Sequence, residues 1–372
     1  MCVEISQQFN INNIKNKMKK LLLTTAIAGS AFFAGNAIAQ TTITGSLDLS
    51  FKAISSEKPA DNIGSTSGMG KEWQVNIQNK GKLNNGMNYA AGFALEHDGA
   101  QTGSTGFDEN IYIDFISGTT TYTFGTDHIQ QSERTLANFV GLIAEDLTNT
   151  TSSSIAADIF VSDVGANPVQ AYGVGVFHTI PNTAVISAWY APNNNSVPAA
   201  GGSAFVGNDD GMFEGNGNGA FEIGITGSLG VKGLNTHAFY NKMDADRSVA
   251  ANVKDTKGTN IGVSYNTGAV TVGYNYKKTE FQTIATTTVS GEVKQDEFGI
   301  AYALTPNLTL AGNYTKADSN ATTLVDAKSK SLAIGYNLGA VALTAQAAKL
   351  ENYTGVSGTD ADVLYLRAST RF

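Results

Sequence analysis

The sequence has few of the residues on which disulfide-rich proteins and most enzymes depend. Its 372 residues include one cysteine, six prolines and four histidines, and only 15% are charged, against roughly 25% in average soluble proteins. The single cysteine, Cys2, precedes a predicted export segment. The mature chain is therefore expected to contain no disulfide and no thiolate metal site.

Sequence motifs for common chemistry are missing as well. The chain has no H-E-x-x-H, no G-x-S-x-G and no Walker loop, so we expect no enzyme and no cofactor. Asp127-His128, at the end of a predicted strand, leaves a Ser-His-Asp barrel hydrolase as an alternative. Removing residues 1–39 takes away four lysines and one glutamate, which changes the net charge from −8 to −11. This acidic balance argues against a nucleic-acid partner.

Residues 18–39 have the composition of a secretory signal peptide. Met18-Lys19-Lys20 precedes an apolar run from Leu21 to Phe33, and Ala37-Ile38-Ala39 provides small residues at the −3 and −1 positions. Cleavage is expected before Gln40. A transmembrane anchor is the alternative, but the apolar run is short for one. Residues 1–17 are predicted to be an upstream extension without function, and residues 40–372 the mature domain.

The last eleven residues show the pattern that repeats along the mature chain. Residues 362–372 alternate, with Leu364, Leu366, Ala368, Thr370 and Phe372 on one face and Val363, Tyr365, Arg367, Ser369 and Arg371 on the other. A period of two predicts a β-strand. One apolar face and one face with arginines suit a wall between lipid and water. The small outward residues Ala368 and Thr370 favour a subunit contact at this strand.

The whole mature chain is predicted to be all-β, with about sixteen strands joined alternately by seven short turns and eight longer loops. Asn85-Gly86 predicts a hairpin turn, because both residues tolerate positive φ. This pattern indicates a transmembrane antiparallel β-barrel. A barrel of sixteen strands leaves an aqueous lumen, whereas eight strands would be filled by side chains.

Signal peptide, strand pairs, a long insert after the fifth strand and a terminal Phe372 together resemble the Gram-negative general porins, and the α-proteobacterial type most. The resemblance covers residues 40–372 and concerns architecture more than individual residues. It implies a homotrimer in the outer membrane through which small hydrophilic solutes and ions diffuse passively. It also implies contact with outer-membrane lipid, and a C-terminal strand whose Phe372 is part of the signal read by the barrel-assembly machinery.

The insert at residues 128–168 is predicted to be the constriction loop, folded inward into the pore. It carries apolar residues that need a surface to pack on, and a long loop of this kind is usually functional or disordered. An exposed surface loop is the alternative. The acidic residues assigned to the constriction are Glu133, Glu145, Asp146 and Asp158 of the insert and Asp114 of the wall.

The alternation of side chains along each strand predicts which charged residues face the pore. The predicted inward bases are Lys52, Lys277, Arg367 and Arg371, and the inward acids include Asp48, Glu96, Asp114, Glu222 and Glu297. Opposed charges in a pore set which ions pass. The alternative for each residue is a solvated lumen position without a special role, and a register slip of one residue would move it outside. The acidic excess favours cations.

Three other functions stay open: the barrel hydrolase named above, a substrate-specific channel, and an adhesin or plugged structural barrel. A substrate-specific channel of the same fold would need an inward aromatic ladder, and the sequence indicates few inward aromatic residues, of which Tyr112 and Tyr365 are the clearest. An adhesin or a plugged structural barrel is a further alternative. Asn208-Asp209-Asp210-Gly211 with Glu214 suggests a loop-bound calcium without matching the EF-hand spacing, and a plain polar loop is the favoured explanation.

Overall fold

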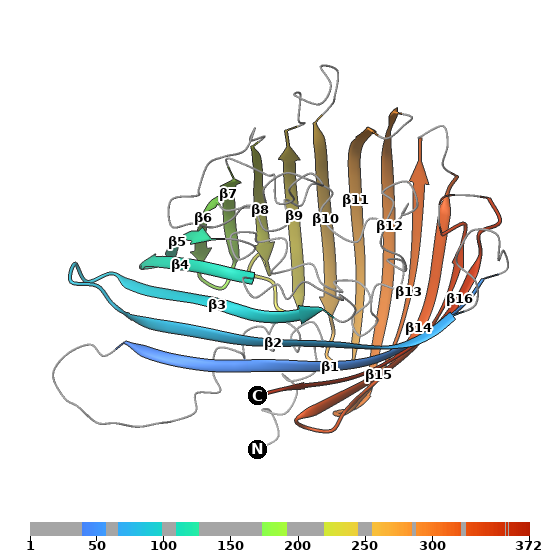
Figure 1. The fold of residues 1–372 in the computed structure, drawn as a ribbon, viewed down its shortest axis with the longest axis horizontal. Coiled ribbons are helices and arrows are strands. Elements are labelled where there is room, and N and C mark those ends of the chain that lie inside the picture. The colour runs from blue at the N-terminus through green and yellow to red at the C-terminus, as the bar shows by residue number, and fades with distance from the viewer. Residues whose placement is uncertain are drawn as a thin grey trace, which may run out of the picture.

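The computed structural model is one closed barrel of sixteen antiparallel strands, as the sequence predicts (Figure 1). Each strand pairs with its neighbours in sequence, and β1 closes the barrel on β16. The strands are β1 (Gln40–Ser56), β2 (Thr66–Lys82), β3 (Asn88–Asp98), β4 (Glu109–Ser117), β5 (Thr120–Gly125), β6 (Gly173–Ile180), β7 (Ala184–Ala191), β8 (Ala220–Gly227), β9 (Leu234–Met243), β10 (Thr256–Asn266), β11 (Val270–Ile284), β12 (Thr288–Thr305), β13 (Leu308–Ser319), β14 (Ala327–Asn337), β15 (Val341–Glu351) and β16 (Ala361–Arg371).

The structure describes residues 39–56, 66–98, 109–125, 173–191, 219–244, 255–284, 288–320, 325–353, 355 and 357–372. Within these ranges there is no helix with the length and hydrophobicity needed to span a bilayer. The predicted upstream extension and all but the last residue of the predicted signal peptide lie outside the described residues, and their assignment stays a prediction.

The two faces of each strand differ in exposure, and the difference identifies the inside of the barrel. On β1, Thr44 is 4% exposed and Asp48 8% exposed, whereas Ile43, the residue directly before Thr44, is 53% exposed. On β12, Phe298 and Ile300 are both more than half exposed. The apolar side chains therefore point outward and the polar ones inward, which is the reverse of a soluble protein and suits a wall with lipid outside.

The connections divide the barrel into two ends. Seven short turns and both strand termini at Gln40 and Arg371 lie at one end, here called the turn end; the opposite end is called the loop end. At the β2–β3 turn, Gly86 has a φ of 87°, but Asn85 does not have positive φ. The hairpin turn predicted at Asn85-Gly86 is confirmed, with positive φ at the glycine alone, and the Asn85 side chain accepts a hydrogen bond from the Met87 N–H at 3.1 Å.

The described strands differ in length around the barrel. Strands β11 and β12 have 15 and 18 residues, whereas β5 has six and β6, β7 and β8 have eight each. A membrane-crossing strand usually needs about 9–11 residues. The segment β5–β8, in which the described strands are shortest, is called the low wall.

Candidate functional site

The candidate site is the inner wall of the barrel, where polar side chains from many strands face a common lumen. Strand parity places every described residue assigned to the pore, namely Lys52, Asp114, Lys277, Arg367 and Arg371, on this inner face. Glu133, Glu145, Asp146 and Asp158 lie outside the described residues, as does the rest of the insert at 128–168.

Arg367 on β16 forms a two-pronged ion pair with Asp48 on β1. The guanidinium donates from Nε to Oδ1 at 3.1 Å and from Nη2 to Oδ2 at 2.6 Å. Both side chains are inward and mostly shielded, at 16% and 11% exposure. Paired geometry of this kind is among the stronger charge-assisted contacts in proteins. The pair joins the first and last strands. The Asp48 carboxylate offsets most of the positive charge that Arg367 would otherwise present to the lumen.

The other predicted wall bases have different surroundings. Arg371, the last residue of β16, lies opposite Ser46 at the turn end, and its Nη1 atom is buried without a hydrogen-bond partner among the described residues. Lys52 lies nearer the loop end of β1, opposite Tyr365. Arg371 therefore lies at the turn-end rim of the lumen, whereas Lys52 lies toward the loop end.

Lys277 and Glu297 form the second charged pair of the wall. Lys277 Nζ lies 2.8 Å from Glu297 Oε1, and Asn275 Nδ2 donates to Oε2 of the same carboxylate at 2.9 Å. Gln295 also donates to Glu297. Lys277 is only 6% exposed. The carboxylate is thus held by three side chains of β11 and β12 and is partly neutralised by one of them.

A buried histidine continues this network along the wall, and the sequence analysis missed it. His237 on β9 is 2% exposed; its Nε2 lies 2.7 Å from Asn260 Oδ1 and 3.1 Å from Asn275 Oδ1. The ring stacks on Phe239 with centroids 5.4 Å apart. The sequence pattern that could have revealed this network is the run of polar residues at the inward-facing positions of β9, β10 and β11. They form a continuous polar band because adjacent strands bring their inward positions side by side.

The opposite wall carries an acid. Asp114 on β4 is 9% exposed and accepts a hydrogen bond from Thr123 Oγ1 at 2.6 Å. Lys80 on β2 lies in the same row across the sheet, with Ala90 between them. In the closed order of sixteen strands, β4 and β12 are eight strands apart in either direction, so Asp114 and the Glu297 cluster lie on opposite sides of the lumen.

Inward aromatic residues are more numerous than the sequence indicated. Tyr112 and Tyr365 are inward as expected, and Tyr112 accepts a hydrogen bond from Gln78. Phe177, Trp189 and Phe239 also lie on the inner face, at 5%, 3% and 2% exposure. Because these three are buried and come from β6, β7 and β9, they are not an exposed ladder on which a passing solute would stack.

The described part of the wall holds no group of three or more potential metal ligands. The predicted calcium loop at 208–211 with Glu214 lies outside the described residues, as does His128 of the hydrolase alternative. The described inner wall thus has a mainly polar lining of two ion pairs, amides and hydroxyls that water can solvate, beside the buried aromatic rings.

Comparison with protein families gives a match to the Gram-negative porin family over residues 24–355. Comparison with curated protein sequences gives no significant match.

Solved structures share the fold at low identity. The anion-selective porin from Comamonas acidovorans is 14% identical with a TM-score of 0.64, covering 90% of this chain and 100% of that one. The outer membrane channel DcaP of Acinetobacter baumannii is 11% identical with a TM-score of 0.61, covering 93% and 100%. OmpT of Vibrio cholerae, in its trimer form, is 12% identical with a TM-score of 0.58, covering 90% and 99%.

Proposed function

The chain belongs to the Gram-negative porin family, from which we infer that it forms a water-filled channel of the outer membrane for passive diffusion of small hydrophilic solutes and ions. The observation that carries this function is the closed sixteen-stranded barrel with a polar inner wall and an apolar outer face. The lumen of a sixteen-stranded barrel holds water, whereas barrels with about eight strands are filled by their side chains. The protein is a channel rather than an enzyme. The α-proteobacterial type stays a prediction.

The barrel has a defined orientation in the membrane. Outer-membrane barrels have short turns on the periplasmic side and longer loops outside. The turn end, with Gln40 and Arg371, therefore faces the periplasm, and the loop end is extracellular. Phe372 then lies at the periplasmic interface, where the barrel-assembly machinery is proposed to read the C-terminal strand.

A general diffusion channel fits the inner wall better than a substrate-specific one. Two ion pairs lie on the described inner wall, Arg367–Asp48 and Lys277–Glu297. Paired charges attract no single class of solute strongly, because the field of each is cancelled by its neighbour. The proposed preference for cations then comes from the acids of the insert, Glu133, Glu145, Asp146 and Asp158, together with Asp114. No cofactor is proposed, and loop-bound calcium near Asp209 stays a prediction.

The constriction proposal concerns the insert at 128–168. If this insert narrows the pore, deletion of residues 136–158 should raise both single-channel conductance and the size limit for sugars in liposome swelling. Deletion of a few residues from the 57–65 connection is the control, which should leave both unchanged. Equal conductance of wild type and the 136–158 deletion would assign the insert to the cell surface instead.

We propose a homotrimer whose subunits meet at the low wall. The described residues of β5 number six, rise ~3.3 Å each and so span ~20 Å along the strand, or ~14 Å across a membrane at a tilt of roughly 45°. The apolar band of such barrels is about 25 Å tall. Its outward residues are nevertheless apolar: Tyr122 is 47% exposed and Phe124 51%. A neighbouring copy would cover this surface, and the trimer form of the OmpT structure supports the stoichiometry.

A further inference from the structure

The turn end of the barrel carries side-chain charge of one sign only. All seven turns, and the three residues of each strand nearest to this end, are among the described residues, and none of them is an aspartate or a glutamate. The lysines and arginines there are Lys80 and Lys82 of β2, Lys232 of the β8–β9 turn and Arg371 of β16. The turn end is therefore cationic.

Three of these cations face the lumen from neighbouring strands. On β2, Lys80 and Lys82 lie in step with Gln78, which faces the lumen. Arg371 lies four positions after the inward Arg367 on β16, and its Nη1 atom is buried without a hydrogen-bond partner among the described residues. Strands β16, β1 and β2 are consecutive in the barrel. Lys80, Lys82 and Arg371 are here called the rim cluster.

The rest of the described inner wall, here called the body, carries net charge of the opposite sign. Its acids are Asp48, Glu72, Glu96, Asp114, Glu222 and Glu297. Its lysines and arginines are Lys52, Lys277 and Arg367. Six acids against three bases give the body a net charge of −3, whereas the three bases of the rim cluster give +3. The lumen is therefore divided along its axis into a cationic and an acidic section.

Asp114 is the body acid that lies nearest to the turn end. It lies in the same row as Lys80, two strands away, which is about 10 Å at ~4.8 Å per strand, and it accepts a hydrogen bond from Thr123. If Asp114 is counted with the rim cluster, the rim keeps a net charge of +2 and the body −2. The opposite signs of the two sections therefore do not depend on where this acid is counted.

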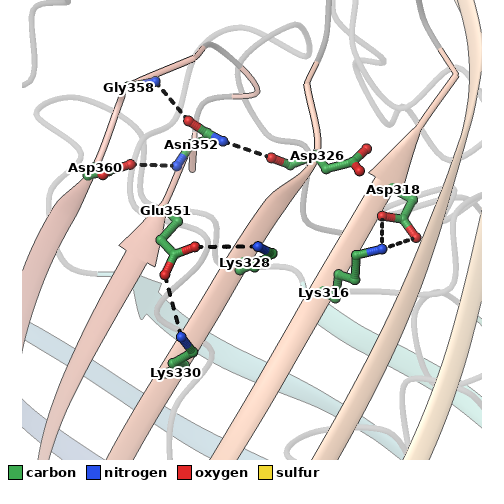
Figure 2. Close-up of polar contacts among 9 residues, drawn as sticks. All are labelled: Lys316, Asp318, Asp326, Lys328, Lys330, Glu351, Asn352, Gly358 and Asp360. Carbon is green, nitrogen blue, oxygen red and sulfur yellow. Dashed lines mark hydrogen bonds and ion pairs between the residues drawn. The ribbon is translucent and has the colours of Figure 1, made fainter.

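The charges on the outer face near the loop end do not change this division. Figure 2 shows lysines and acids of β13, β14 and β15 in contact with one another. Lys316 Nζ lies 2.6 Å from Asp318 Oδ1, and Lys328 Nζ lies 3.7 Å from Glu351 Oε2. These side chains point away from the lumen and combine both signs. The division is thus a property of the inner wall.

The two sections are far enough apart to act separately. Lys277, which pairs with Glu297, lies seven residues from Val270 at the turn end of β11. Seven residues at ~3.3 Å each span ~23 Å along the strand, or ~16 Å across the membrane at a tilt of roughly 45°. The Debye length is about 10 Å in 0.1 M salt. The rim cluster and the middle of the body therefore keep distinct fields at that salt concentration.

We propose that these two sections make the channel an ion rectifier, which passes more current when the loop end is positive. The rim cluster attracts small anions to the turn end, and the body attracts cations. With the loop end positive, cations crossing the body and anions crossing the rim both move toward the boundary, where salt accumulates and conductance rises. With the opposite polarity both leave the boundary, which is depleted of ions. The inference rests on the proposed diffusion channel.

The test is the current–voltage curve of single channels of the purified, full-length protein in planar bilayers. In about 0.1 M KCl the current should be larger with the loop end positive than at the same voltage of opposite sign. The ratio of the two currents should fall to about one in about 1 M KCl, where the Debye length is roughly 3 Å. Asn84→Cys in a Cys2→Ser background, labelled by a membrane-impermeant maleimide from one side, identifies the side that holds the turn end.

Two variants test the rim cluster. Lys80→Gln, Lys82→Gln and Arg371→Gln together should bring the current ratio to about one, because the cationic section is removed. Lys80→Glu combined with Lys82→Glu leaves the C-terminal strand unchanged and gives the rim the same sign as the body, so it should also abolish rectification.

Lys278→Gln, Lys294→Gln and Lys316→Gln together are the matched control, because they remove three lysines that point outward near the loop end and contact acids there. The control should keep the current ratio of wild type. Equal wild-type currents at both polarities in low salt, a larger current with the loop end negative, or equal loss in the rim and control variants would overturn the proposal. Each of these results leaves the diffusion channel standing, whereas absence of conductance would overturn the channel itself.

Discussion

Phe372, the last residue, pairs with Gly45 near the start of the barrel. The Gly45 N–H donates to the Phe372 carbonyl at 2.7 Å, and the Phe372 N–H donates to the Gly45 carbonyl at 3.0 Å. A Cβ added at Gly45 would lie 2.5 Å from Cζ of the Phe372 ring and 3.0 Å from the Gln74 carbonyl oxygen. Gly45 is therefore the position that lets the terminal ring lie across β1 where the barrel closes.

Replacement of Gly45 by valine should weaken barrel closure. The added side chain must displace the Phe372 ring, and overpacking of this kind typically costs about 1–3 kcal/mol. The folded fraction can be measured by the shift in gel mobility between unboiled and boiled samples. Gly68→Val is the control, because a Cβ at Gly68 meets nothing within 4 Å. Phe372→Ala in the Gly45→Val background should recover part of the loss, and no recovery would place the strain elsewhere.

The Arg367–Asp48 pair makes a prediction about ion preference. Asp48→Asn leaves the Arg367 charge uncompensated in the lumen and should shift the reversal potential toward anions. Arg367→Gln leaves the Asp48 carboxylate and should shift it toward cations. The double variant should return close to wild type, because the pair contributes little net field. Single variants that shift in the same direction would show that the pair does not act as a neutral unit.

His237, buried on the inner face of the wall, and His178, which is exposed, differ in their expected contribution to stability. His237→Ala removes a ring that contacts Asn260 and Asn275, and it leaves buried amides unpaired, at a cost of about 1–3 kcal/mol. His178 is exposed and contacts Thr120, so His178→Ala should change stability by no more than about 0.5 kcal/mol. Urea unfolding of the refolded barrel, followed by tryptophan fluorescence, gives both values. Equal losses would contradict a structural role for the His237 network.

The low wall and the C-terminal strand are rival subunit contacts. Phe124 on β5 points outward at 51% exposure, and Phe124→Arg should convert the trimer to folded monomers. Ala368→Arg, on the strand that the sequence analysis favoured for a subunit contact, should leave the trimer intact. Mass in detergent together with gel mobility distinguishes a dissociated barrel from an unfolded one. The opposite pattern would assign the contact to β16.

The sequence alone predicted the strand count, the antiparallel barrel and the face on which each described pore residue lies. A period of two decides inside from outside, so Arg367, Lys277 and Asp114 could be placed on the lumen side without coordinates. The same period does not say which residues meet across strands, because that depends on the stagger between strands. Asp48 and Arg367 are 319 positions apart and meet only through the closing register of β1 and β16.

Other parts of the site have no periodic signal. His237 was passed over because a single histidine between polar residues has no recognisable motif, and only the neighbouring positions of Asn260 and Asn275 explain its burial. Phe177 and Trp189 were not identified as inward because short strands provide few residues from which to judge parity.

The most direct test of the channel function is single-channel recording in planar bilayers with the purified, refolded protein. A water-filled diffusion pore should insert in discrete steps, conduct in proportion to salt concentration, and show no saturable block by any one sugar. Absence of conductance from protein with the heat-modifiable mobility of a folded barrel would contradict the account, and block by a single sugar at low concentration would replace general diffusion with a substrate-specific channel.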